Sequence, residues 1–309
     1  MGHGGMSVGR QFDQQHARTP TWPPAGGDDV VVHSTLARRP VPSPLSSRRP
    51  LVIAHRGASK SAPEHTLAAY RAAIEQGADG VECDVRLTAD GVPVCVHDRR
   101  VDRTSDGIGV VSALELADLE TLDFAARTAG AVAADGTEPD RDRAGVLTLE
   151  RLLGLVADAG RPLEIAIETK HPTRYAGLVE RRVVETLRRF DLLAPRDGRS
   201  TARIMSFSPL GLRRVRELAE RVPTVLLLDR VPLRLRDGRL PAGVSVVGPS
   251  IEALHEHPHY VERAHARGHG VHVWTVNAPE DVAFCYELGV EAVITDRPLA
   301  ARTLLSSLI

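Results

Sequence analysis

The 309-residue chain is poor in cysteine, lysine and aromatic residues. Its three cysteines, Cys83, Cys95 and Cys285, are too few and odd in number for a disulfide framework, which favours a reducing compartment and a cytoplasmic protein. Lys60 and Lys170 are the only lysines among 39 basic residues. Because aromatic residues make up 4% of the chain, the core must consist mainly of Val, Leu, Ile and Ala.

Long apolar runs and an excess of one charge are absent as well. No segment approaches the about 18 uninterrupted apolar residues of a membrane span, so we expect no stable membrane insertion. The 39 basic and 40 acidic residues nearly cancel, which argues against a nucleic-acid partner held by a large basic surface. These patterns leave the oligomeric state open.

The first 49 residues differ from the rest of the chain. They are rich in Gly, Pro, Ser, Arg and His, which predicts a disordered extension, and they contain no apolar run typical of a secretory signal peptide. At roughly 150 residues per domain the chain would hold about two domains, but a single α/β barrel commonly reaches about 250 residues. We expect one barrel domain over residues 50–309.

Within that domain, short aliphatic runs alternate with amphipathic helical runs, a pattern typical of parallel βαβ units. The parallel strands are expected to begin near residues 51, 80, 163, 203, 224, 244, 271 and 292. This number of strands predicts a (β/α)₈ TIM barrel. Residues 128–145 are rich in Ala, Asp and Gly and are predicted to be a surface insertion.

One further strand, Pro93–His97, follows the second barrel strand too closely for a crossover helix. The Asp90-Gly91 turn signal therefore predicts an antiparallel hairpin arm. A turn symmetric about residues 88–91 would place His97 opposite Glu82, about 5 Å away on the same face. The same register would put Cys83 and Cys95 on opposite faces, so we expect no disulfide between them.

Carboxylates gather on the second and third parallel strands. Glu82 and Asp84 share one strand face, where they repel each other unless a cation joins them, and hard oxygen ligands suit Mg²⁺ or Ca²⁺. An arginine-paired structural dyad is the alternative. Glu168 lies at the active end of its strand and is a further ligand candidate, whereas Glu164, about 13 Å away, is expected to be structural. Lys170 can reach a phosphate or the carboxylates.

A third group, His55-Arg56-Gly57, ends the first barrel strand, and a barrel carries its active site at that end. His55 can act as an acid or base near neutral pH, and Arg56 offers a planar fork to a phosphate. A structural histidine is the alternative at this position.

Taken together, these motifs resemble the glycerophosphodiester phosphodiesterase family over residues 51 to about 300. The resemblance is carried by His55-Arg56-Gly57, Pro63-Glu64-His65-Thr66, Glu82-x-Asp84, His97-Asp98, Glu168-x-Lys170, Ser206-Phe207, Trp274-Thr275-Val276-Asn277 and Thr295-Asp296-Arg297-Pro298. It implies a TIM-barrel phosphodiesterase that hydrolyses a small-molecule glycerophosphodiester to glycerol 3-phosphate and an alcohol.

The resemblance also implies roles for individual residues. One divalent cation, Mg²⁺ or Ca²⁺, would be bound by Glu82, Asp84 and Glu168. His55 and His97 would be the general acid and base, in an order that the sequence leaves open, with the substrate's own glycerol hydroxyl or water as the nucleophile. The phosphate would be held by Arg56 and Lys170.

Two positions within these motifs can each be interpreted in two ways. His65 stands where the family usually has Asn, so the preceding Glu64 is either a substrate-binding residue or part of a loop that serves to cap a helix through Thr66. Trp274 either forms a wall of the substrate pocket, where it could cover a glycerol or choline-like group, or packs in the core.

Other functions remain alternatives. A related barrel enzyme could cleave lysophospholipids or phosphoinositides, but it would need an apolar lip, and residues 128–145 are too polar to form one. A catalytically inactive barrel could bind a phosphorylated ligand, but every expected catalytic position is filled, which argues against it.

Overall fold

The computed structural model describes residues 1, 49–127, 141–173, 177–195 and 201–309. All elements named below belong to the unit Ser43–Ile309. The expected N-terminal extension and most of the expected insertion at residues 128–145 lie outside the described residues, so the predicted domain boundary stays a prediction.

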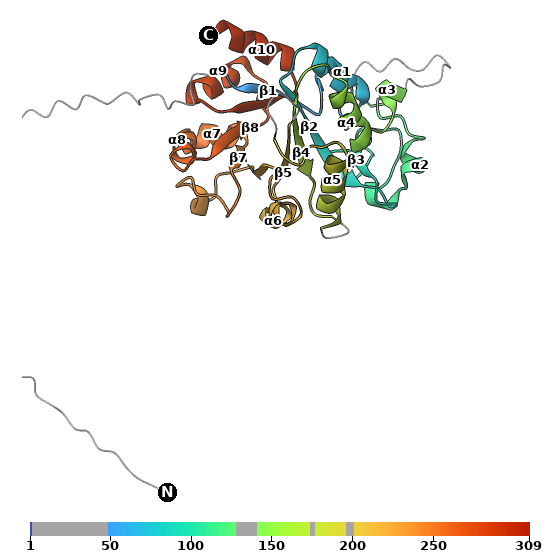
Figure 1. Ribbon diagram of the computed structural model, residues 1–309, viewed down its shortest axis with the longest axis horizontal. Helices are drawn as coiled ribbons and strands as arrows, with labels where there is room; N and C mark the ends of the chain where they lie inside the picture. Colours follow the sequence, from blue (N-terminus) through green and yellow to red (C-terminus); the bar gives the residue numbers. More distant parts are fainter. Residues whose placement is uncertain (2–48, 128–140, 174–176, 196–200) are drawn as a thin grey trace, which may run out of the picture. The chain divides into compact units, whose positions relative to one another are not determined.

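Eight parallel strands close into a barrel with helices around it (Figure 1). They are β1 (Leu51–His55), β2 (Gly80–Leu87), β4 (Glu164–Thr169), β5 (Thr201–Ser206), β6 (Thr224–Leu228), β7 (Val246–Pro249), β8 (Gly270–Val273) and β9 (Ala292–Thr295). β1 pairs with both β9 and β2, which closes the ring. The TIM barrel is confirmed, and each strand begins within two residues of its predicted start.

The helices follow the strands as the βαβ pattern predicts. The longer ones are α1 (Leu67–Glu75), α4 (Leu149–Ala157), α5 (Leu178–Arg189), α6 (Pro209–Leu218), α7 (Ile251–Glu256), α8 (Tyr260–His265), α9 (Pro279–Leu288) and α10 (Pro298–Ser307). Shorter helices are η2 (Val111–Ala113), α2 (Leu116–Leu119), α3 (Arg141–Ala144) and η3 (Leu233–Leu235). No helix in the described ranges is both long and apolar enough to cross a membrane.

Side-chain caps begin several of these helices. The hydroxyls of Thr66, Thr148, Ser208 and Ser250 each accept a hydrogen bond from a backbone N–H in the first turn of α1, α4, α6 and α7. Such caps each stabilise a helix by about 1 kcal/mol. The capping role considered for Thr66 is therefore present, and it sets where the loop that carries Glu64 and His65 ends.

The core is aliphatic, as the scarcity of aromatic residues predicts. Two clusters fill the space between strands and helices, and a smaller one inside the barrel includes Ile53, Met205 and Ile294. Glu164 lies at the opposite end of β4 from Glu168 and pairs with Arg203 on β5. This agrees with the structural role expected for Glu164.

The antiparallel arm is confirmed as β3 (Pro93–Cys95), which pairs with β2. Its predicted register is wrong by one residue, because Val85 lies opposite Cys95. Thr88 and Val92 are joined by backbone hydrogen bonding and by the Thr88 hydroxyl, so the turn has three residues and Gly91 adopts a φ of 82°. The prediction assumed a turn with one residue fewer, and Glu82 does not pair with His97.

The register also corrects the placement of the cysteines. Because Cys95 is opposite Val85, it shares a strand face with Cys83 instead of lying on the other side. Both are buried in the same core cluster, and both are free thiols. The predicted reason for expecting no disulfide, that the two cysteines lie on opposite faces, was therefore wrong.

Gly80 provides a test of how tightly the barrel closes. It pairs with Ile53 and Glu164, and an added Cβ would lie 2.4 Å from the Glu164 carbonyl oxygen. Gly80→Ala should lower the free energy of unfolding by roughly 1–3 kcal/mol, measured by urea denaturation. Gly154→Ala on α4 is the matched control: nothing lies within 4 Å of its added Cβ, so it should stabilise by up to about 1 kcal/mol. An unchanged Gly80→Ala protein would contradict this account of the closure.

Candidate active site

A cavity of about 260 Å³ opens at the carboxyl ends of the barrel strands. The predicted site residues that line it are His55, Arg56, Glu82, His97, Glu168, Lys170 and Trp274. They come from β1, β2, β4, the end of β8 and the segment after β3. The structure therefore brings together residues that lie more than 200 positions apart in the sequence, at the end of the barrel where the sequence places the site.

Three buried carboxylates form the centre of the site. Glu82 and Asp84 extend from β2, and Glu168 lies directly opposite Asp84 on β4. Ligand oxygens of the three residues lie within 4.8 Å of one another. This arrangement could hold a metal ion, and its all-oxygen donor set suits a hard divalent cation.

Asp84 is surrounded by positive and hydrogen-bonding groups. Its carboxylate lies 3.0 Å from Arg56 Nε, 2.9 Å from His65 Nε2 and 3.2 Å from Lys170 Nζ. Burial alone would raise the pKa of Asp84, but these partners lower it well below its usual value. The arginine-paired interpretation therefore applies to Asp84, which stays ionised.

The negative charges of Glu82 and Glu168 are less well balanced by neighbouring positive groups. Burial and the charge of Asp84 raise the pKa of Glu82, which accepts a hydrogen bond from the Arg56 backbone N–H at 3.1 Å. Burial and Asp84 also raise the pKa of Glu168 to about 8, although Lys170 Nζ lies 2.9 Å away. A bound divalent cation would remove this repulsion, which is the physical reason to expect one here.

Each of the two candidate catalytic histidines is held by a carboxylate through Nδ1. His55 Nδ1 lies 2.7 Å from Asp296 Oδ1, and Asp296 also accepts hydrogen bonds from Ser59 and Asn277. Burial would raise the pKa of Asp296, but the hydrogen bond from His55 and these other contacts lower it to about 2. Nε2 of His55 is thereby left for chemistry in the cavity.

His97 reaches the cavity by a different route from the one predicted. β3 ends at Cys95 and the chain bends at residues 97–99, so the strand register no longer sets the direction of His97. Its Nδ1 lies 2.7 Å from Asp98 Oδ1, and its carbonyl accepts two hydrogen bonds from Arg86 at 3.0 and 2.8 Å. Burial lowers the pKa of His97 and favours the neutral imidazole.

Arg103 links the two sides of the site. It forms a bidentate pair with Glu64 at 2.7 and 2.8 Å, and its Nε lies 2.6 Å from Asp98. Glu64 in turn lies 3.1 Å from Arg56 Nη1. The structure thus places Glu64 behind Arg56, and it is not among the residues that line the cavity. Burial would raise the pKa of Glu64, but Arg103 and Arg56 lower it to about 2.

His65 takes up the position where the family usually has Asn. Its φ of 60° lies in the left-handed region, which few residues other than Gly and Asn favour. The buried ring lies between Asp84 Oδ2 at 2.9 Å and the Tyr70 hydroxyl at 2.8 Å. The larger imidazole is accommodated as a positioning group for Asp84 and does not line the cavity.

Trp274 lines the cavity, as the pocket-wall interpretation predicts. Its indole N–H donates to the Gly248 carbonyl at 2.7 Å, and Phe207 packs edge-on against it with ring centroids 5.5 Å apart. Sequence reasoning assigned no role to Asp98, Arg103 or Asp296. Asp98 and Asp296 stand within motifs that were recognised, whereas no sequence signal pointed to Arg103.

Comparisons with known proteins agree with this geometry. The model of the glycerophosphoryl diester phosphodiesterase family matches residues 55–300. A probable glycerophosphodiester phosphodiesterase 1 of Mycobacterium tuberculosis is 49% identical over 253 residues, which cover 81% of this chain and 90% of the relative. The glycerophosphodiester phosphodiesterase of Bacillus subtilis is 33% identical over 258 residues, which cover 82% and 86%.

A solved structure is also similar. The phosphodiesterase of Oleispira antarctica, in complex with the product sn-glycerol-3-phosphate, superposes with a TM-score of 0.69 and 25% identity. The match covers 85% of this chain and 99% of that chain.

The raised pKa of Glu168 predicts a pH-dependent cation affinity. Below about pH 8 Glu168 is mainly protonated, and a divalent cation binds the carboxylate form. Affinity for Mg²⁺ or Ca²⁺ should therefore rise from pH 6 to about 8 as Glu168 ionises, with close to one proton released by Glu168 at pH 7, and Glu82, whose pKa is also raised, adds to this release. Calorimetry in two buffers of different ionisation enthalpy measures both effects.

Glu168→Gln should weaken binding and remove the part of this proton release that comes from Glu168. Glu217→Gln, a change at an exposed position of α6, is the matched control and should alter neither. Wild-type affinity that does not vary between pH 6 and 8 would contradict the prediction.

Proposed function

The chain belongs to the glycerophosphoryl diester phosphodiesterase family, and from this we infer that it is an enzyme that hydrolyses glycerophosphodiesters to glycerol 3-phosphate and an alcohol. The observation that carries the inference is the cavity in which Arg56, Lys170 and two histidines meet two carboxylates of the buried acidic cluster. An inactive phosphate-binding barrel would have no need for this complete set. The free thiols support the predicted cytoplasmic location.

We propose that Glu82, Asp84 and Glu168 bind one Mg²⁺ or Ca²⁺ ion. Their buried oxygens and uncompensated negative charge fit such an ion. When bound, the cation supplies stabilisation of the charge that develops on the non-bridging phosphate oxygens.

Arg56 and Lys170 are proposed to make the site attractive to the phosphodiester. Three ionised carboxylates outweigh a divalent cation by one negative charge, and the substrate phosphate is itself an anion. The two basic side chains reverse the sign of the site. Glu64 and Asp84 hold the Arg56 guanidinium by contacts of 3.1 and 3.0 Å, so that it is positioned before the substrate arrives.

His97 and His55 are proposed to move the protons. The lowered pKa of His97 keeps it neutral near pH 7, the form that a general base requires. It would remove the proton from the attacking hydroxyl of the substrate glycerol or of water. His55, oriented by Asp296, would donate a proton to the oxygen of the departing alcohol.

His97→Ala should lower kcat by about 10²–10⁴ while the fold is retained, because one general acid or base contributes about this factor. Release of glycerol 3-phosphate from glycerophosphocholine measures the rate, and circular dichroism checks the fold. His259→Ala changes an exposed histidine at the start of α8 and should leave the rate unchanged. Near-wild-type turnover by His97→Ala would sink the assignment.

Arg103→Ala tests whether the ion pairs of Arg103 with Glu64 and Asp98 position the groups of the site. Losing the bidentate pair should lower kcat by about 10- to 100-fold with little effect on KM, since small displacements of catalytic groups carry costs of this order. Asp98 raises the pKa of His97, and Arg103 offsets that carboxylate, so the acidic limb of the kcat profile should move to higher pH.

Arg103→Lys keeps the charge but loses the fork geometry. The Arg103→Lys variant should have a lower kcat, but the acidic limb of its kcat profile should stay at the same pH. If neither Arg103 variant changed kcat or the profile, Arg103 would have only a structural role.

A further inference from the structure

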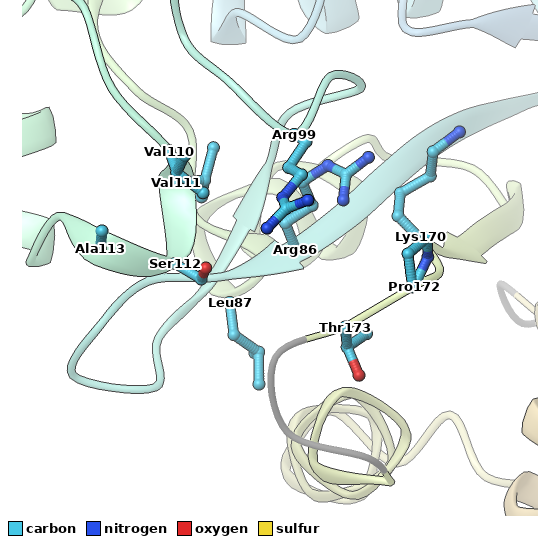
Figure 2. Close-up of a pocket in the computed structure, with 10 residues that line it drawn as sticks. All are labelled: Arg86, Leu87, Arg99, Val110, Val111, Ser112, Ala113, Lys170, Pro172 and Thr173. Carbon is cyan, nitrogen blue, oxygen red and sulfur yellow. The ribbon is translucent and has the colours of Figure 1, made fainter.

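A second and larger cavity, of about 530 Å³, lies beside the active site. Its lining comes from the end of β2, the segment after β3, η2 and the segment after β4 (Figure 2). Lys170 lines both cavities. Its ammonium lies between Asp84 and Glu168, so its side chain forms the wall that the two cavities share.

Two arginines give the second cavity a positive charge. Arg86 shares a strand face with Asp84, two residues or about 7 Å further along β2, and it donates to the His97 carbonyl. Arg99 follows on the segment that leaves β3 and is exposed. Figure 2 shows both side chains between the 110–113 segment and the segment of Lys170.

No carboxylate in the described ranges forms an ion pair with either arginine. The acidic groups around them already have other partners. Asp84 and Glu168 contact Lys170, and Asp98 pairs with Arg103 and His97. The Arg99 guanidinium and the Nη1 group of Arg86, which makes no hydrogen bond to the His97 carbonyl, are thus available to an anion that enters the cavity.

The rest of the lining is aliphatic. Leu87, Val110, Val111, Ala113 and Pro172 contribute apolar surface next to the arginines. A ligand that matches both the arginines and the aliphatic surface of this cavity has a carbon skeleton with an anionic group at its far end. An alcohol joined to a phosphate at the acidic cluster would extend past Lys170 in this direction.

We propose that the second cavity is the subsite for the alcohol part of the substrate and that it selects alcohols carrying a second anionic group, such as a phosphate monoester. The proposal rests on the proposed function and adds a substrate class to it. Arg86 and Arg99 bind the second anion, while the aliphatic wall contacts the carbon skeleton.

The test compares two substrates that differ only in this group: glycerophosphoinositol and glycerophosphoinositol 4-phosphate. The wild-type enzyme should show a kcat/KM at least about 10-fold higher for the phosphorylated substrate, a typical effect of hydrogen bonds to a charged group. Arg99→Ala should bring the ratio towards one, and Arg99→Glu should bring it below one. Any general loss of activity affects both substrates and cancels in the ratio.

Arg100→Ala is the matched control, since Arg100 is a neighbouring exposed arginine that pairs with Asp102 and does not line the cavity. It should keep the wild-type ratio. A wild-type ratio near one, or a ratio that the Arg99 variants do not change, would overturn the subsite while leaving the proposed function intact. Failure to hydrolyse these substrates and glycerophosphocholine would instead count against the proposed function.

Added inorganic phosphate tests whether the second cavity binds the anionic group of the substrate or a separate, free anion. If the cavity bound a free anion, added phosphate would change the turnover of unphosphorylated glycerophosphoinositol, and Arg99→Ala would remove that change. This outcome, together with a wild-type substrate ratio near one, would overturn the assignment to the alcohol group. Phosphate that competes equally in wild type and Arg99→Ala acts at the acidic cluster and supports the proposed subsite.

Discussion

The site depends on the cost of burying three carboxylates at one end of a barrel. Glu82, Asp84 and Glu168 lie on two adjacent strands, where they repel one another and are shielded from water. Part of that cost is offset by protein cations, which gather around Asp84. The remainder appears as the raised pKa values of Glu82 and Glu168. The barrel thereby holds a buried acidic cluster that could bind a metal ion.

Ion pairs that begin at these carboxylates also fix the positions of other groups in the site. Arg56, which neutralises Asp84, is held by Glu64, and Glu64 is held by Arg103. Arg103 continues to Asp98, which orients His97. A continuous chain of charged contacts therefore runs from a metal-ligand candidate to the histidine proposed as general base. Such preorganised groups need little rearrangement when charge develops in a transition state, which is how an enzyme site lowers a barrier.

Lys170 has a special position in this architecture. Most basic positions in the chain are arginine, but the wall between the two cavities needs a compact ammonium that contacts two carboxylates at once. On one side of this wall is the proposed phosphate site, and on the other are Arg86 and Arg99. The near-zero net charge of the chain thus conceals a local separation of charge, with acidic groups at the centre and, beside it, two guanidinium groups that form no ion pair with a carboxylate of the described residues.

The barrel, its strand starts and most of the residues that line the cavity follow from the amino-acid sequence alone, because strand and helix periodicity and short motifs are local properties. The sequence did not determine the hairpin register, which depends on hydrogen bonds that close a three-residue turn at Gly91, nor did it show how His97 turns into the site. The partners of the two proposed catalytic histidines also come from the tertiary structure alone. Asp296 lies 241 residues from His55, and the pairing of β1 with β9 that closes the barrel brings the two together, while the segment that follows β3 brings Arg103 to Glu64, 39 residues away.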